Sequence, residues 1–269
     1  MRSAKGHGTE NDFVLVDGDD LPELTAGLAR ALCDRRAGVG ADGVLRVDRR
    51  EGHWFMDFRN ADGSLGETCG NGIRVFARYL VATGRAEPGA LEVGTRAGLK
   101  QIDVPALGDI TVDMGAPRFL PDRPVVAGVS GVLPGTAISM GNPHVVVVLD
   151  SEADLAALDL NHAPVPAPAL AGGQNVEYVV RTGPRSIAMR VHERGVGETR
   201  SCGTGTCAAV AAVAGTDDGA RDADWAVSVP GGQLGVRWTS AGSMRMTGPA
   251  VLIWQGTLDE QWYAAAAAG

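Results

Sequence analysis

The sequence predicts an α+β fold of two similar halves, each with mostly antiparallel strands around one central helix. Short β-like runs alternate with turn residues along most of the 269-residue chain, a pattern typical of antiparallel sheets. Few segments have helical spacing. Two of these follow near copies of the motif Cys-Gly-(Asn/Thr)-Gly that lie about half the chain apart, which indicates an internal duplication.

The predicted strands are short apolar runs separated by Gly, Pro or polar turn residues. They lie at 13–18, 43–48, 53–60, 90–98, 110–115, 144–150, 176–180, 187–195, 225–232, 234–239 and 251–256. A Pro-rich stretch at 114–125 is the expected crossing between the halves. The final residues, WYAAAAAG, predict an unstructured tail.

The helices are predicted from the spacing of apolar residues. Segment 21–36 has leucines near helical spacing. Segment 71–84 has apolar residues at i, i+3, i+4 and i+7 counted from Ile73, and Gly84 provides a C-terminal stop. Segment 207–215 is apolar on every side, which is typical of a helix that is buried all round.

Composition and charge exclude several classes of protein. Hydrophobic residues make up 45% of the chain and charged residues 21%, which is ordinary for a globular protein. The net charge is −8 and no Lys/Arg block is present, so nucleic acid and anionic membranes are not the expected partners. The N-terminus lacks an apolar signal segment, and no run approaches the roughly 18 apolar residues of a membrane helix. We therefore expect a cytoplasmic protein with reduced thiols.

Two of the four cysteines are candidate catalytic thiols. Cys69 and Cys202 precede predicted helices, whereas Cys33 and Cys207 lie within helices and are expected to be inert core residues. A helix N-terminus has unpaired N–H groups and a partial positive charge, so a thiol there is expected to have a lowered pKa. The neighbouring glycines let backbone N–H groups approach a bound carboxylate. Each motif therefore predicts a basic sulfur together with a carboxylate cradle.

A pair of thiols that face one ligand suits racemisation at an α-carbon. One thiolate removes the proton, and the other thiol returns a proton from the opposite face. Most enzymes labilise such a proton with pyridoxal phosphate, which needs a Schiff-base lysine. Only Lys5 and Lys100 are present, and neither lies in a phosphate-binding context. We therefore expect a reaction without a cofactor, and no Cys/His spacing predicts a metal site.

Five segments resemble the diaminopimelate epimerase family: HGTENDFVLVD, RNADGSLGETCGNGIRVFARYL, GNPHVVVVL, QNVEYV and HERGVGETRSCGTGTCAA. The resemblance implies two pseudo-symmetric domains, each a β-barrel-like sheet around a central helix. The first domain would comprise 1–116 and 249–260, the second 117–248, and a tail 261–269. The resemblance also implies cofactor-free interconversion of LL- and meso-2,6-diaminopimelate in lysine and peptidoglycan precursor biosynthesis, with a homodimer as the assembly to expect.

The resemblance further implies roles for individual residues. Cys69 and Cys202 would form the acid/base pair, with Cys69 as donor and Cys202 as acceptor in the conventional direction. His144 and Glu193 would tune the two sulfurs. The residues that would contact substrate are Gly70, Asn71, Gly203 and Thr204 at the reacting carboxylate, Glu193 and Arg194 at the distal end, and Asn11, Asn60, Asn142 and Asn175 as polar contacts.

Alternatives stay open at this stage. The asparagines could form turns, and Glu193 and Arg194 could form an exposed ion pair of little consequence. A related proline or hydroxyproline racemase would carry His in place of Asn71. The alternatives from other classes are a redox or metal-binding protein and a non-catalytic scaffold. The chain also departs from the family pattern at Thr9, Glu10, Gly43 and Val75.

Overall fold

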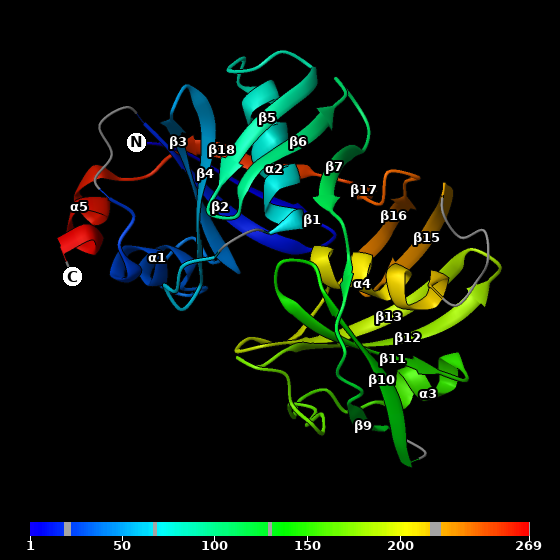
Figure 1. Cartoon of the computed structure of the whole chain (residues 1–269). Coiled ribbons are helices and arrows are strands. Elements are labelled where there is room, and N and C mark those ends of the chain that lie inside the picture. The colour runs from blue at the N-terminus through cyan, green and yellow to red at the C-terminus, as the bar shows by residue number, and fades with distance from the viewer. Residues whose placement is uncertain (19–22, 67–68, 129–130, 216–221, 269) are drawn as a thin grey trace. The chain divides into compact units, whose positions relative to one another are not determined.

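The structure, a computed structural model of the chain, describes residues 1–18, 23–66, 69–128, 131–215 and 222–268. Contacts within the chain define two compact units (Figure 1). Unit 1 comprises Met1–Val112 with Pro249–Gly269, and unit 2 comprises Asp113–Gly248. The division falls four residues before the boundary that we predicted after residue 116.

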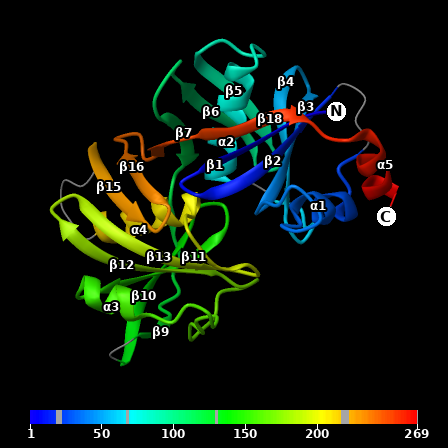
Figure 2. The ribbon, with the colours of Figure 1, turned by 180° about the vertical axis from the view of Figure 1, so that it is seen from behind.

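Unit 1 is a mostly antiparallel sheet that packs against one buried helix. Antiparallel pairing joins β18 to β1, β1 to β2, β3 to β4, β5 to β6 and β6 to β7, whereas β2 with β3 and β4 with β5 are parallel. Figure 2 shows β18 beside β1, although the two strands are far apart in sequence. The strands are β1 (Arg2–Gly8), β2 (Asn11–Asp17), β3 (Gly43–Arg50), β4 (His53–Asn60), β5 (Gly89–Thr95), β6 (Gly98–Val104), β7 (Ile110–Gly115) and β18 (Val251–Thr257); the last three residues of β7 belong to unit 2.

Unit 2 repeats this order of pairing. From β10 to β11, β12, β13, β15, β16 and β17, successive pairs are antiparallel, parallel, antiparallel, parallel, antiparallel and antiparallel. The same sequence of directions runs from β1 to β7, so the predicted duplication is present in the fold. The strands are β8 (Arg118–Phe119), β9 (Val125–Gly128), β10 (Gly131–Ser139), β11 (Pro143–Leu149), β12 (Asn175–Gly183), β13 (Ser186–Glu193), β14 (Gly197–Thr199), β15 (Ala223–Val229), β16 (Gly232–Trp238) and β17 (Met244–Gly248).

Each unit has one buried helix that follows a cysteine motif. Helix α2 (Gly70–Ala82) contacts β1, β2, β3, β6 and β18 in unit 1. Helix α4 (Gly203–Ala214) contacts β10 to β13, β16 and β17 in unit 2, and every one of its residues is buried. Helix α2 ends just before Gly84, whose φ of 68° is the left-handed conformation that favours glycine. Helix α4 begins four residues before the predicted position, because Cys202 caps its first turn.

Three shorter helices cover the outside of the units. Helix α1 (Ala26–Cys33) is shorter than the predicted segment 21–36, since Thr25 caps it by accepting a hydrogen bond from Leu28 N at 3.1 Å. Residues 21 and 22 of that segment lie outside the described residues. Helix α3 (Glu152–Ala157) begins after Ser151 in unit 2.

The prediction of an unstructured tail is wrong. The chain end forms α5 (Glu260–Ala268), in which Tyr263 is buried and packs into the apolar cluster that includes Leu24, Leu28 and Leu32. This contact with a distant segment stabilises a helix whose alanine-rich sequence has no amphipathic period of its own. In the part of the chain that the structure describes, no helix combines the length and apolar character required to cross a bilayer.

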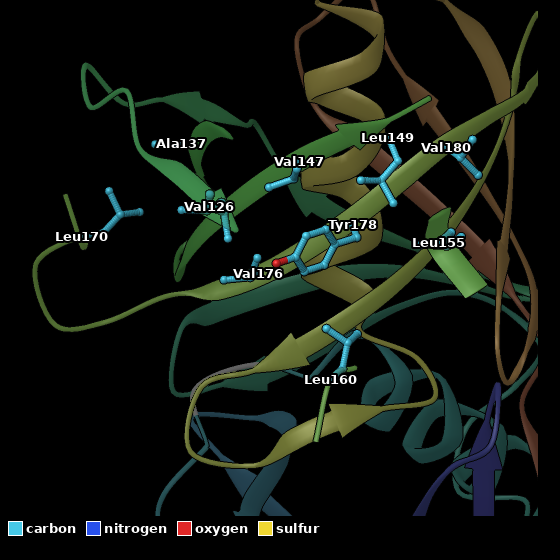
Figure 3. Packing of buried hydrophobic residues seen from close by; sticks show 11 residues of the cluster. Val126, Ala137, Val147, Leu149, Leu155, Leu160, Leu170, Val176, Tyr178 and Val180 are labelled. Atoms are coloured by element: carbon cyan, nitrogen blue, oxygen red, sulfur yellow. The ribbon is translucent and has the colours of Figure 1, made fainter. Parts of the chain in front are cut away.

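Residues 144–147 of β11 and 175–180 of β12 are buried on both faces. Side chains alternate along a strand, and Val145, Val147 and Val176 point with Tyr178 into the apolar cluster shown in Figure 3. The Tyr178 hydroxyl donates to Ala127 O at 2.9 Å. The alternate residues of both strands therefore point to the opposite face, where α4 contacts both strands.

Candidate functional site

In unit 1, Cys69 occupies the N-terminal cap of α2. Its backbone is extended, with φ −126° and ψ 112°, and its Sγ accepts a hydrogen bond from Gly72 N at 3.3 Å. The sulfur thus occupies the place that a Ser or Asp oxygen usually takes at a helix N-cap. The first N–H groups of a helix have no acceptor within the helix, so the turn formed by Gly70 and Asn71 is suited to bind an anion.

The amides of Asn11 and Asn71 lie beside this sulfur. Asn11 Oδ1 is 3.6 Å from Cys69 Sγ and accepts from Asn71 Nδ2 at 3.2 Å. Asn11 Nδ2 donates to Asp42 Oδ2 at 2.8 Å, which turns the carbonyl oxygen of Asn11 toward the sulfur. The structure therefore brings together Asn11, Asn71 and Cys69, as the sequence predicts, and adds Asp42 as the residue that orients Asn11.

Arg74 is a buried charge behind Asn71. Its Nη2 donates to Asn71 Oδ1 at 3.0 Å and to Thr9 Oγ1 at 3.4 Å, and its Nη1 donates to Gly70 O at 3.1 Å. A buried guanidinium requires such acceptors because an unsatisfied buried charge is costly. Arg74 therefore fixes the first turn of α2, a role that we did not predict from the sequence.

Asn60 lies at the end of β4 and is engaged within its own turn. Its Nδ2 donates to Ser64 Oγ at 2.9 Å, and its backbone N–H donates to Ser64 O at 3.0 Å. These contacts are those of the turn alternative, and they do not connect Asn60 to Cys69. A role for Asn60 in substrate binding stays a prediction.

In unit 2, Cys202 occupies the same position at the N-cap of α4. Its φ of −124° and ψ of 115° are nearly those of Cys69, and its Sγ accepts from Gly205 N at 3.4 Å. The Cys202 side chain is buried, whereas Cys69 is partly exposed. The two units therefore present the same capping geometry around sulfurs of different accessibility.

A connected polar group surrounds Cys202. Thr204 Oγ1 lies 3.5 Å from Cys202 Sγ and accepts from Asn142 Nδ2 at 3.3 Å. Asn142 Oδ1 lies 3.0 Å from His144 Nε2, and His144 Nδ1 lies 2.7 Å from Glu177 Oε1. The structure therefore brings Asn142, His144 and Thr204 together at the sulfur. It also places Glu177, which we did not predict, in the same group.

Asn175, Glu193 and Arg194 lie around the end of β13. Asn175 Oδ1 accepts from Arg194 N at 2.9 Å, and the exposed Arg194 guanidinium donates to Gly172 O. The hydroxyl of Thr199 donates to Glu193 Oε1, and the Glu193 carboxylate lies near enough to Cys202 to act on its charge. Glu193 and Arg194 do not pair with each other in these contacts, so the surface ion-pair alternative is not what the structure shows.

The lowered pKa that we predicted for both sulfurs does not hold at Cys202. Burial raises the pKa of its thiol well above the ordinary value, and the nearby carboxylates of Glu193 and Glu177 add to the rise. The hydrogen bonds from Thr204 and Gly205 act in the opposite direction but do not outweigh burial. Burial likewise raises the pKa of Glu193. Cys202 is therefore a thiol with a raised pKa that lies near the Glu193 carboxylate.

Comparison with known proteins agrees with this arrangement. The family model described as diaminopimelate epimerase matches residues 3–120 and 136–253. A protein of Streptomyces coelicolor named diaminopimelate epimerase is 48% identical over 279 residues, which cover 96% of this chain and 95% of that protein. A protein of the same name from Thermobifida fusca is 48% identical over 274 residues, which cover 95% and 97% of the two chains.

Solved structures with low sequence identity share the fold. A PhzF-family phenazine biosynthesis protein of Bacillus anthracis matches with a TM-score of 0.73 at 17% identity, over 96% of this chain and 99% of that chain. A hydroxyproline epimerase of Agrobacterium vitis matches with a TM-score of 0.69 at 16% identity, over 99% and 98%. From its sequence over nearly its whole length, this chain belongs to the diaminopimelate epimerase family.

Proposed function

We propose that this protein interconverts LL- and meso-2,6-diaminopimelate by a two-cysteine reaction that uses no cofactor. The observation that carries the proposal is the repeated N-cap: in a chain of this family, each unit holds a cysteine sulfur at the first turn of its buried helix. A reaction that inverts one stereocentre needs two acid/base groups, and the duplicated fold supplies two. We place the reaction in the cytoplasm, in the biosynthesis of lysine and peptidoglycan precursors.

The reaction moves three protons and forms no covalent bond to the enzyme. Glu193 accepts the proton of Cys202, and the resulting thiolate removes the α-proton of the LL substrate. The electron pair of the broken C–H bond stays on the α-carbon and is delocalised into its carboxylate. Cys69 then donates its thiol proton to the opposite face of that carbon, which gives the meso product and leaves Cys69 as a thiolate. The roles reverse for the return reaction.

The substrate carries an ammonium and a carboxylate at each end. We propose that the backbone N–H groups of Gly70, Asn71, Gly203 and Thr204 bind the carboxylate of the reacting end, where they stabilise the charge that develops on it. The guanidinium of Arg194 can bind the distal carboxylate in a bidentate manner. The amides of Asn11, Asn60, Asn142 and Asn175 can donate or accept hydrogen bonds with either charged group.

Deuterium incorporation tests the proposal. The purified protein, freed of metal and pyridoxal phosphate, is incubated with LL-diaminopimelate in D2O, and the α-proton signals are followed by NMR. We expect meso product with deuterium at the inverted carbon. Cys69→Ala and Cys202→Ala should each lower the rate by about 10²-fold or more, since each removes an acid/base group. Cys33→Ala is the matched control and should leave the rate unchanged, because Cys33 is a buried residue of α1. An absence of α-deuterium would reject the proposal.

Proline offered under the same conditions tests the alternative of a related amino-acid racemase. The features that favour diaminopimelate are Asn71, where the proline enzymes carry His, and the charged residues Glu193 and Arg194. We expect no deuterium exchange at the proline α-carbon. If deuterium exchanged into proline and not into diaminopimelate, the proposed substrate would be wrong and proline would take its place.

We also propose that two copies of the chain form a dimer through β18. Val251, Ile253 and Trp254 of this strand are 44%, 59% and 41% exposed, so the strand carries apolar side chains at the surface of unit 1. Exposed apolar patches of this kind often mark interfaces. Sedimentation should give a dimer for the unchanged chain and a monomer for Ile253→Glu. A monomer in both would contradict the proposal.

A further inference from the structure

We propose that Glu177 is a positioning residue that fixes the direction of a hydrogen-bond chain ending on the sulfur of Cys202. The inference deepens the proposed function, because it concerns how one of the two acid/base sulfurs is prepared. Glu177 does not touch the sulfur through a hydrogen bond of its own. It acts through His144, Asn142 and Thr204.

Strand register places Glu177 in this position. Asn175 and His144 are direct partners in the parallel pairing of β11 with β12, and Val146 is the partner of Glu177. Glu177 lies two residues after Asn175, so both side chains point to the face of β12 opposite Tyr178, where α4 packs. Glu177 and His144 are both fully buried.

The carboxylate of Glu177 also lies against the first turn of α4. A Cβ atom added to Gly205 would lie 2.6 Å from Glu177 Oε1 and 3.2 Å from Cys202 Sγ. Only a glycine lets the carboxylate and the sulfur share this helix end. The close approach shows that the Glu177 carboxylate is packed into the turn that caps Cys202.

Four contacts lead from Glu177 to the sulfur. They are Glu177 Oε1 to His144 Nδ1 at 2.7 Å, His144 Nε2 to Asn142 Oδ1 at 3.0 Å, Asn142 Nδ2 to Thr204 Oγ1 at 3.3 Å, and Thr204 Oγ1 to Cys202 Sγ at 3.5 Å. Asn175 Nδ2 also approaches His144 Nδ1, but at 3.5 Å, so the shorter contact to Glu177 decides the role of that nitrogen.

The hydrogen bonds have one consistent direction. Asn142 Oδ1 can only accept, so its contact with His144 Nε2 requires a proton on Nε2, and the Glu177 carboxylate, which shares a second proton with Nδ1, stabilises that form of the ring. The amide nitrogen of Asn142 then donates to Thr204 Oγ1. The Thr204 hydroxyl proton is therefore directed toward Cys202 Sγ. Together with Gly205 N, this hydroxyl gives the sulfur two donors, which stabilise a thiolate when the proton leaves.

Glu177 is poorly suited to a purely structural role. Its Oε2 is buried and has no hydrogen-bond partner among the residues that the structure describes. A buried polar atom without a partner is unfavourable for folding, and replacement of a buried ion pair by apolar side chains is often neutral or stabilising. Glu177 therefore lowers the stability of the folded protein, and we infer that it is present for its effect on the Cys202 sulfur.

The charge of Glu177 and its hydrogen bond have opposite effects on Cys202. The charged groups that face the sulfur are Glu177 on β12 and Glu193 on β13, with His144 on β11 beside them. The negative charge of Glu177 disfavours a thiolate at Cys202. The hydrogen-bond chain that Glu177 orients favours a thiolate there. Glu177→Gln and Glu177→Met both remove the charge, but only Gln keeps a hydrogen-bond partner for His144 Nδ1. Comparison of these two variants therefore separates the effect of the hydrogen-bond chain on Cys202 from the effect of the charge.

The experiment measures the pH dependence of alkylation at each cysteine by peptide mass spectrometry, with iodoacetamide as the probe. We expect the titration midpoint of Cys202 to lie about one pH unit higher in Glu177→Met than in Glu177→Gln, which corresponds to the loss of one hydrogen bond to a charged group. The midpoint of Cys69 should not differ between the variants. In turnover, kcat should be about tenfold lower in the Met variant, with KM within about twofold.

Two further variants keep the test decisive. Thr204→Val removes the last donor and should raise the Cys202 midpoint by a similar amount, and in that background Glu177→Met and Glu177→Gln should give the same midpoint. Val179→Ala, which changes a buried residue on the same face of β12, should lower thermal stability without moving either midpoint. Equal Cys202 midpoints in the Gln and Met variants, or a difference between them that persists with Thr204→Val, would overturn the inference. Alkylation requires no substrate, so its outcome is independent of whether diaminopimelate is epimerised.

Discussion

The turn between β1 and β2 holds two residues in the left-handed region. Thr9 has a φ of 49° and Glu10 a φ of 62°, a conformation that is unfavourable for residues other than glycine, by about 1–2 kcal/mol each. Thr9 is held there by hydrogen bonds between its hydroxyl and both Asn71 and Arg74. The turn therefore carries backbone strain directly before Asn11, next to the Cys69 half of the site.

Glu10→Gly should relieve part of this strain. We expect the free energy of unfolding to rise by about 0.5–1 kcal/mol, because glycine adopts a positive φ without steric cost. Urea denaturation measures the change. Thr9→Gly is the matched control: it relieves the same strain but loses the hydroxyl contacts, so it should give no gain. A less stable Glu10→Gly variant would contradict this account of the turn.

Asp12 should make the stability of the protein depend on pH. Burial alone would raise the pKa of Asp12, but the hydrogen bonds and charges of Arg35 and Lys5 lower it from 3.8 to about 2. A carboxyl whose pKa is lower in the folded state stabilises that state above the unfolded pKa, and the contribution is lost as the pH falls from about 4 to about 2.

Asp12→Asn should therefore lower the free energy of unfolding by about 1–2 kcal/mol at pH 7. The difference from the unchanged protein should shrink as the pH falls toward 2. Denaturation at a series of pH values checks this. A difference that is independent of pH would show that Asp12 acts through packing and not through its charge.

At the scale of elements, α2 and α4 are similar helices in different surroundings. A Cβ added to Gly72 would meet atoms of Cys69, Leu45 and Phe13 no closer than 3.4 Å, whereas a Cβ added to Gly205 would meet Glu177 Oε1 at 2.6 Å. The two glycines occupy the same position relative to the capping sulfur. Only the one in unit 2 is required by a neighbouring carboxylate.

Gly72→Ala and Gly205→Ala should therefore change the stability of the protein in opposite directions. Gly72→Ala should leave stability unchanged or raise it by up to about 1 kcal/mol, since alanine favours a helix. Gly205→Ala should lower stability by about 1–3 kcal/mol through overpacking and should reduce activity by displacing Glu177. Thermal unfolding and kcat measure both. Equal effects of the two substitutions would mean that the Glu177 carboxylate moves aside without consequence.

The sequence predicted the elements whose signals are local. Helix α2 has clear apolar spacing and a glycine stop, and α4 was recognised from its uniform apolar composition. Helix α5 was missed because it depends on a contact between Tyr263 and a distant cluster. The cysteines and several amides of the candidate site were recognised from motifs. Glu177 was missed because it lies in VEYVV, a strand buried on both faces, where neither alternation nor a turn distinguishes a functional carboxylate.

At the scale of the whole molecule, the duplicated strand order explains why two equivalent sulfurs exist. Both units have the same sequence of parallel and antiparallel strand pairs. In each unit, the cysteine is the N-cap of a buried helix. Duplication provides one sulfur per unit, and the surroundings then make the two sulfurs different. Amides surround Cys69, whereas carboxylates and a histidine surround Cys202. One duplicated fold thus holds two sulfurs in the same capping geometry but in different polar surroundings.

This mechanism predicts that oxidation links the two catalytic cysteines. Sulfurs that act on opposite faces of one carbon must come close together during the reaction. A thiol oxidant such as diamide accepts the two hydrogens of the thiols and leaves a disulfide. We expect a Cys69–Cys202 peptide in mass spectra of the oxidised protein, with loss of activity in proportion to its yield. Dithiothreitol should restore both thiols and the activity.

Single-cysteine variants control the oxidation experiment. Cys202→Ala should form no linked peptide, and Cys33→Ala should form it as readily as the unchanged protein, because Cys33 is a buried residue of α1 that has no part in the proposed reaction. Cys33 should remain reduced throughout. Full activity after exhaustive oxidation, or a linked peptide that contains Cys33, would show that Cys69 and Cys202 do not act on the same carbon.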